Sequence, residues 1–186
     1  MSGAIYTVES GIAPGWEAEF LRWQAEEHVP LLLGLPGYRR VTRFRAADIP
    51  RSFLNLWEVD STERFHAPSH DATVNTSWKA RVLPARQVLV VSFYRLVETL
   101  AGPAQRRPAA ILLRHRWPTG PAYEAAAVAQ SLAAEPASCA VHHLVEEGEP
   151  YRVTLLHLLA EDAPLAPSLG VETDRFTAIA PPKDPV

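Results

Sequence analysis

The fold of this chain is decided by one stretch near its start, residues 19–44, which reads EFLRWQAEEHVPLLLGLPGYRRVTRF. Apolar residues recur at helical spacing from residue 16 to about residue 29. After the Pro-Gly pair, the pattern changes to the β-branched and aromatic residues that are typical of a strand, over residues 38–45. The stretch therefore predicts a helix that is followed, after one tight turn, by a strand.

The segments around this stretch complete one compact motif. Further strands are predicted over residues 5–10, 53–59 and 87–97, and a helical pattern broken at Pro68 covers residues 61–82. The order is β-α-β-β-α-β. That is the ferredoxin-like arrangement, in which a helical layer covers one face of an antiparallel sheet.

The second half of the chain repeats this order in shortened form. A linker, AGPAQRRP over residues 101–108, precedes a strand, an Ala-rich helix and two strands, predicted over residues 110–117, 121–134, 139–145 and 151–159. The next helix is missing or reduced to residues 164–175, and a short last strand is predicted over residues 176–180. We therefore predict an α+β fold of tandem ferredoxin-like repeats, residues 1–100 and 108–186. The second repeat is abbreviated, and together they form a fused pseudo-dimeric α+β barrel.

Composition excludes several classes of protein. The 186 residues are 47% hydrophobic and 21% charged, which is too apolar for a disordered chain, and the net charge of −3 comes without the clustered basic face of a nucleic-acid-binding protein. The apolar runs are far shorter than the ~20 residues that span a bilayer. The lone Cys139 cannot form an intramolecular disulfide. We expect a cytoplasmic protein with neither nucleic acid nor membrane as a partner.

Particular residues carry a resemblance to a known family. They are Trp23, Glu27, His28, Pro30, Pro36 and Gly37, followed by FLNLWEVDS over residues 53–61 and NTSWKARV over residues 75–82. With these motifs the first half resembles the dimeric α+β barrel superfamily and, within it, the EthD-like group. There the helix reads Trp-Tyr-x-x-Glu-His-x-Pro, and Gln24 replaces the Tyr here. The superfamily hosts cofactor-free cyclases and isomerases as well as haem-degrading and quinone-forming monooxygenases, so the resemblance implies small-molecule chemistry without fixing the reaction.

The helix itself predicts an acid/base pair. At about 100° per residue, Glu27 falls within the aromatic stripe that should face the sheet, where burial raises the pKa of a carboxyl unless a cation such as Arg40 or Arg43 pairs with it. His28 falls at the edge of the stripe, and Pro30 removes a backbone donor from the last turn. Glu27 and His28 are thus candidate catalytic residues. The alternative is a structural role, in which Glu27 forms a salt bridge and His28 closes the helix end.

Other side chains are candidates for binding a ligand. Asn55 and Trp57 share one strand face, and Trp78 and Arg81 are three residues apart on the second predicted helix, where a ring and an Arg fork could cover a cavity. Core packing is the alternative for Trp78. The predicted substrate-binding residues are Trp23, Gln24, Arg43, Asn55, Trp57, His66, Trp78 and Arg81.

The remaining histidines do not predict a metal site. His66 and His70 have the i, i+4 spacing of a metal pair, but Pro68 lies between them and no third ligand is evident. His115 and His157 lie in the middle of apolar strands, where core histidines bonded to the backbone are the favoured interpretation.

These patterns lead to one function and two alternatives. The favoured function is a cofactor-independent enzyme, of cyclase, isomerase or lyase type, acting on a small apolar, aromatic or polyketide-like molecule in the first repeat. The alternatives are a non-catalytic binding barrel and a haem-type monooxygenase. The fused repeats predict a monomeric pseudo-dimer or a homodimer.

Overall fold

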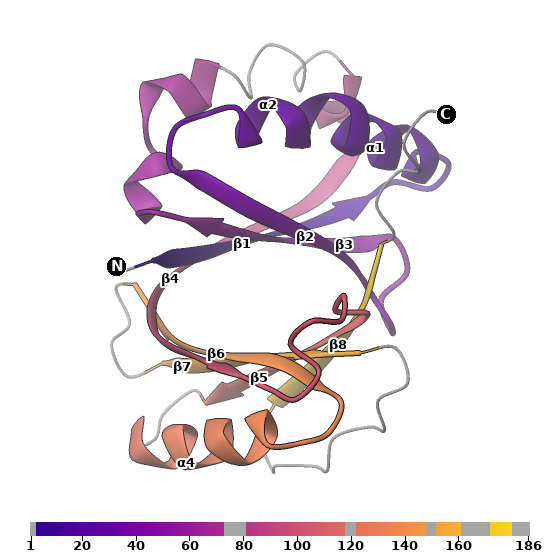
Figure 1. Cartoon of the computed structure of the whole chain (residues 1–186). Coiled ribbons are helices and arrows are strands. Elements are labelled where there is room, and N and C mark those ends of the chain that lie inside the picture. The colour runs from indigo at the N-terminus through magenta and orange to yellow at the C-terminus, as the bar shows by residue number, and fades with distance from the viewer. Residues whose placement is uncertain (1–2, 73–80, 118–121, 148–151, 161–171, 180–186) are drawn as a thin grey trace. The chain divides into compact units, whose positions relative to one another are not determined.

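The computed structural model describes residues 3–72, 81–117, 122–147, 152–160 and 172–179 (Figure 1). The elements, in chain order, are β1 (Ala4–Ile12), α1 (Glu17–Trp23), η1 (Gln24–His28), α2 (Val29–Leu33), β2 (Tyr38–Ala46), β3 (Ser52–Val59), η2 (Thr62–Arg64), η3 (Leu83–Ala85), β4 (Arg86–Ala101), β5 (Ile111–Trp117), α4 (Ala122–Ala133), β6 (Ser138–Glu146), β7 (Val153–Leu159) and β8 (Glu172–Ala178). They form two compact units. Unit 1 comprises residues 1–45, 49–93 and 179–186, and unit 2 comprises residues 46–48 and 94–178.

The sheet of unit 1 has the ferredoxin-like strand order. β3 lies between β1 and β2 and is antiparallel to both, and the first part of β4 lies beside β1, giving the order β4-β1-β3-β2. Asn55 is opposite Val8 on one side and Arg43 on the other, while Trp57 is opposite Tyr6. Because opposite residues share a face of a sheet, these five side chains lie on the same face.

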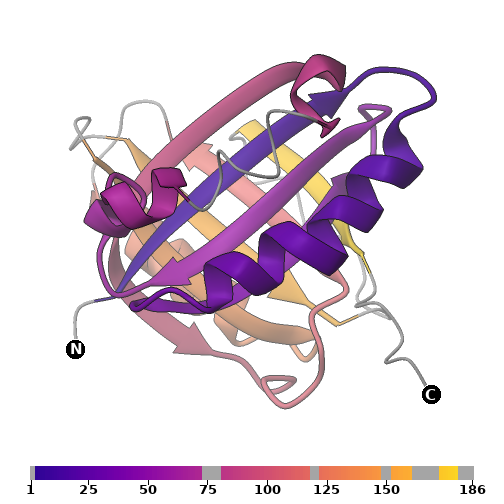
Figure 2. The same ribbon diagram turned by 90° about the horizontal axis from the view of Figure 1, so that it is seen from above.

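One long helical segment covers that face. α1, η1 and α2 follow one another without a break and run along the strands (Figures 1 and 2). The sequence pattern placed the helix end near residue 29, which is wrong, because the helix continues to Leu33. Pro30 occupies the first turn of α2, after a π-helical turn in which the N–H of Val29 bonds to the carbonyl of Gln24. A proline lacks the N–H that a regular α-helix needs, so the wider turn accommodates it.

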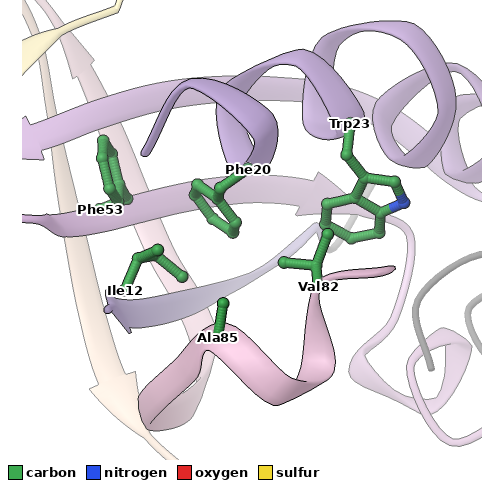
Figure 3. Packing of buried hydrophobic residues seen from close by; sticks show 6 residues of the cluster. All are labelled: Ile12, Phe20, Trp23, Phe53, Val82 and Ala85. Carbon is green, nitrogen blue, oxygen red and sulfur yellow. The ribbon is translucent and has the colours of Figure 1, made fainter. Parts of the chain in front are cut away.

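The core of unit 1 lies between this helix and the sheet. One cluster, drawn in Figure 3, joins Phe20 and Trp23 from the helix to side chains of β1, β3 and the segment before β4, namely Ile12, Phe53, Val82 and Ala85. Rings of Phe20 and Phe53 lie 5.0 Å apart, between centroids. The aromatic stripe recognised in the sequence therefore serves as the contact between helix and sheet.

Unit 2 repeats the strand order of unit 1. Its strands are ordered β8-β5-β7-β6, with β7 antiparallel to β5 and β6, and the second part of β4 pairs with β6. α4 packs Ala129, Leu132 and Ala133 against Val141 and Leu155 of this sheet. The predicted fold class, an α+β chain of tandem ferredoxin-like repeats, is confirmed. The described part of the chain contains no helix that is long and apolar enough to cross a bilayer.

The end of the second repeat differs from the expectation. β8 begins at Glu172, so residues 172–175, which were assigned to a reduced helix, form a strand instead. Arg116 of β5 pairs with both Glu172 and Asp174, and Arg114 pairs with Asp174 at 2.8 Å. Such cross-strand ion pairs favour the extended form. The rest of the predicted helix, residues 164–171, lies outside the described residues.

Candidate functional site

A cavity of about 330 Å³ lies in unit 1. The strands contribute Tyr6, Val8, Ser10, Asn55 and Trp57 from the face described above, the long helical segment contributes Gln24, His28 and Leu32, and later segments contribute Phe65, His70, Asp71, Leu83, Arg86, Leu89 and Val91. Most of this lining is apolar, with a few polar groups that converge on one space. That combination is typical of small-molecule sites.

Aromatic rings form one wall of the cavity. Tyr6 stacks on Trp57 with 6.0 Å between ring centroids and 13° between planes, and Phe65 meets Tyr6 edge-on at 5.2 Å. The Tyr6 hydroxyl lies 3.4 Å from that of Tyr38, and burial, together with Tyr38, raises the pKa of Tyr6. Tyr6 is therefore a neutral ring that can pack against a flat ligand.

An amide pair joins the helix to the sheet at the cavity. Asn55 donates from Nδ2 to Oε1 of Gln24 at 2.8 Å, and the two residues are only 5% and 4% exposed. Buried amides need such partners, since an unsatisfied polar group costs about 1–3 kcal/mol. The position at which the EthD-like group has Tyr thus holds one half of a buried hydrogen bond.

His28 lies between two indoles. Its ring stacks on Trp23 at 4.4 Å between centroids and meets Trp57 edge-on at 6.1 Å. Burial lowers its pKa to about 3, and the neighbouring His70 adds to that effect. The imidazole is therefore neutral at physiological pH, and its low pKa makes it a weak base.

A second histidine, His70, also lines the cavity. His70 is 5% exposed, and its ring lies parallel to that of Tyr38, with 6.2 Å between centroids. Burial lowers its pKa, and Asp71 opposes that shift. Nδ1 of His70 lies 3.6 Å from Oδ1 of Asp71. Two neutral imidazoles thus line one small space.

The structure corrects the expectation of a buried Glu27. Its side chain is 35% exposed, does not line the cavity, and accepts a hydrogen bond from Nη1 of Arg81 at 2.8 Å. The cation is neither Arg40, which pairs with Glu58, nor Arg43. A π turn holds one residue more than an α turn, which rotates the residues after it by up to about 100°. That rotation turns Glu27 toward solvent and His28 toward the cavity.

The other predicted ligand-binding residues are divided between the cavity and its surroundings. Gln24, Asn55 and Trp57 line the cavity, as does His28. Trp23 belongs to the core, Arg43 lies beside Asn55 on β2 without lining the cavity, and the exposed Arg81 pairs with Glu27. His66 is exposed and packs against Phe93 at 5.0 Å, outside the cavity lining. Trp78 lies outside the described residues.

Four of the fifteen described lining residues were predicted, so eleven were missed, among them Tyr6, Phe65, His70, Asp71 and Arg86. Tyr6 could have been found, because alternation places it on the face of Trp57 once β1 is paired with β3. For His70, the sequence offered the i, i+4 spacing of a metal pair and left open whether its side chain reaches the cavity. Among the residues that the structure describes, no group of three or more His, Cys, Asp or Glu can hold a metal ion.

Comparison with known proteins shows similarity in structure and not in sequence. No protein-family model and no curated protein matches the sequence. An anthrone oxidase-like protein matches with a TM-score of 0.61 and 12% identity, over 96% of this chain and 92% of its own. A proposed monooxygenase from Lactobacillus acidophilus has a TM-score of 0.64 and 10% identity, over 96% and 94% of the two chains.

A proposed chlorite dismutase has a TM-score of 0.54 and 9% identity, over 97% of this chain and 96% of its own. At such identities a structural likeness shows the fold alone. Because the matches span nearly all of each chain, they include both repeats. The chain therefore shares the fold of these proteins, which agrees with the α+β arrangement of two ferredoxin-like repeats.

Proposed function

We propose that this protein is a cofactor-independent enzyme that uses acid/base chemistry on a small, largely apolar aromatic or polyketide-like molecule bound in the cavity of unit 1. The observation that carries the proposal is the convergence of two neutral histidines, His28 and His70, on a cavity walled by Tyr6 and Trp57. A neutral imidazole can accept a proton at physiological pH, and the rings can stack on a flat substrate. The first-half motifs support the further proposal of an EthD-like relationship.

The cavity residues can divide the chemistry among them. A histidine removes a proton from a carbon next to a carbonyl or an aromatic ring, which leaves negative charge on the substrate. Arg86 lines the same cavity and, with the amide pair of Gln24 and Asn55, can stabilise that charge. Glu27, predicted as a catalytic acid, pairs with Arg81 outside the cavity lining and has no part in this division.

The names of the structural neighbours favour an oxidation. If the substrate is of the anthrone type, its CH₂ group loses a proton, and the carbanion reacts with dioxygen. One oxygen atom becomes the new carbonyl and the other leaves as water, so that CH₂ + O₂ gives C=O + H₂O. An isomerase, cyclase or lyase would begin with the same proton removal, so the fate of the carbanion sets the reaction class.

Oxygen uptake with anthrone tests this proposal. Protein stripped of metal and haem should consume one O₂ for each anthrone oxidised, and replacing the histidine that acts as base, by His28→Ala or His70→Gln, should lower kcat by about 10²-fold or more. Glu27→Gln should keep most of the activity, because Glu27 is partly exposed and lies outside the cavity lining. Tight binding of anthrone without turnover or proton exchange would instead favour the non-catalytic binding barrel.

A haem-type monooxygenase is the second candidate function. It is favoured by the same neutral imidazoles, because histidine is a common axial ligand of haem iron, and His28 or His70 could supply it. Titration with haem separates the two candidates. A Soret band that is lost in His70→Gln or His28→Ala would support the haem protein, and oxygen uptake without haem would support the cofactor-independent enzyme.

A further inference from the structure

We infer from the structure that His70 takes the proton from the substrate and that Asp71 is a positioning residue that passes this proton to bulk water. The inference rests on the proposed function and extends it. It selects one of the two cavity histidines as the base, and it assigns a route by which the proton leaves an otherwise apolar site.

The neighbouring side chains of His70 and Asp71 differ sharply in their exposure to solvent. Both residues line the cavity, but the His70 side chain is only 6% exposed whereas that of Asp71 is 71% exposed. The pair therefore crosses the wall of the cavity from inside to outside. A proton on His70 has a carboxylate next to it that is in direct contact with water.

The distance between the His70 ring and the Asp71 carboxylate suits an ion pair. At 3.6 Å, Nδ1 of His70 and Oδ1 of Asp71 are too far apart for a hydrogen bond to a neutral ring, yet close enough for an ion pair once the imidazole is charged. Nδ1 has no other hydrogen-bond partner among the described atoms. The contact thus strengthens only when His70 carries the proton, which is when a proton acceptor is needed.

The surroundings of His70 show why Asp71 matters. The groups that face His70 are His28 from η1, Tyr38 from β2, His66 from the preceding turn, and Asp71 itself. His66 disfavours a positive charge on His70, and burial disfavours it further. Among these groups only Asp71 stabilises protonated His70. His28, enclosed by Trp23 and Trp57, is the weaker base of the two, because burial lowers its pKa to about 3.

The step balances in protons and electrons. The substrate C–H bond breaks, its electron pair stays on carbon, and the proton binds Nδ1 of His70, which in the neutral ring has no hydrogen-bond partner within the described part of the chain. The same proton moves from Nδ1 to the Asp71 carboxylate and from there to water, which restores the neutral ring. No oxidant or cofactor takes part in this exchange.

Hydrogen–deuterium exchange isolates this route from the oxidation. Anthrone is incubated with the whole protein in D₂O without oxygen, and loss of its CH₂ proton signal is followed by NMR, with the rate without protein subtracted. Exchange requires both a base and an exit to solvent. Binding of anthrone is measured separately by quenching of tryptophan fluorescence.

The inference predicts a distinct set of results. His70→Gln should abolish the protein-dependent exchange, and Asp71→Asn should slow it about tenfold or more with unchanged anthrone affinity. In Asp71→Asn the acid limb of the exchange rate should also move to lower pH, because the imidazolium loses its partner. Asp71→Glu should recover part of the rate. The matched control Glu63→Gln, an exposed carboxylate on η2, should behave as wild type.

Two other results would overturn the inference in different ways. If Asp71→Asn exchanges as fast as wild type with an unmoved acid limb, Asp71 is not the exit, and the proposed function still stands. If wild-type protein binds anthrone and neither exchanges nor oxidises it, the proposed function fails, and the inference fails with it.

Discussion

At the scale of single residues, the site depends on how each buried polar group is satisfied. Asn55 and Gln24 satisfy each other at 2.8 Å, whereas Glu27 and Arg81 form a partly exposed ion pair at the same distance. Equal distances do not imply equal contributions to stability. Buried hydrogen bonds are costly to break on one side, while exposed ion pairs contribute little.

Breaking the amide pair should therefore destabilise the protein. Asn55→Ala leaves the buried Gln24 without its partner and should lower the free energy of unfolding by about 1–3 kcal/mol, measured in urea. The double variant Asn55→Leu/Gln24→Leu should recover part of that loss, because no polar group is then left unsatisfied. A double variant as unstable as the sum of its singles would contradict the pairing.

Removing the exposed ion pair should have little effect. Arg81→Gln should change the free energy of unfolding by less than about 1 kcal/mol, since both side chains remain in contact with water. The effect should shrink further in high salt. A loss of several kcal/mol, insensitive to salt, would mean that Glu27 is buried in solution as the sequence pattern predicted.

At this scale the sequence identified four of the fifteen described residues that line the candidate site. Asn55 and Trp57 could be found because they share one strand face, and Gln24 and His28 because they lie in the helix motif of residues 23–30. Asp71 and Arg86 could not, because neither belongs to a periodic pattern or a motif that points to a cavity. Only the tertiary arrangement brings them to the cavity.

At the scale of elements, the helical segment is the part that the sequence pattern misplaced. A wheel at about 100° per residue assumes a regular α-helix, and the π turn over Gln24–His28 breaks that assumption. Pro30 is a visible signal of irregularity, but it does not say whether the helix ends or widens. The structure shows that the helix continues through a π turn. The π turn determines that His28, and not Glu27, faces the cavity.

Deleting the exposed Glu26 tests the role of the π turn. With one residue fewer, η1 can close as a regular α turn while the flanking residues keep their directions. The free energy of unfolding of the shortened protein should lie within about 1 kcal/mol of the wild-type value. The shortened protein should still bind anthrone, because the deletion removes only the residue that the wider turn accommodates. Loss of binding with an intact circular dichroism spectrum would show that the π turn itself positions the site.

At the scale of the whole molecule, the two repeats share a strand order and differ in their buried chemistry. The strand pattern was readable from sequence in both repeats, because β-branched and aromatic residues mark seven of the eight strands closely. β8 was placed too late, since its first residues are charged and are held by partners on β5. No local pattern reports such pairing.

Buried histidines in unit 2 should make stability depend on pH. His115 and His157 lie on β5 and β7, which are adjacent, paired strands of one sheet. Burial lowers the pKa of each to about 4, and His115 lowers the pKa of His157 further. The unfolded chain binds protons below about pH 6.5, which the folded chain cannot do until about pH 4. Stability should therefore fall as pH drops through that window and stay level above it.

Urea unfolding at a series of pH values checks this expectation. His157→Leu removes one of the two groups, so the midpoint should fall less steeply between about pH 6.5 and pH 4 than in wild type. Cys139→Ser, which also lies in β6–β7 surroundings but does not titrate in that window, is a control for perturbing the core. Identical slopes in wild type and His157→Leu would contradict the neutral, buried state of that ring.

The central claim is that small-molecule chemistry belongs to the cavity of unit 1. The most direct test is an NMR titration of ¹⁵N-labelled protein with anthrone under nitrogen. The account predicts shifts of the side-chain amides of Gln24 and Asn55 and of the indole N–H of Trp57, with the amides of β7 unchanged. Shifts that cluster in β5 and β7, or no shifts at saturating anthrone, would contradict it.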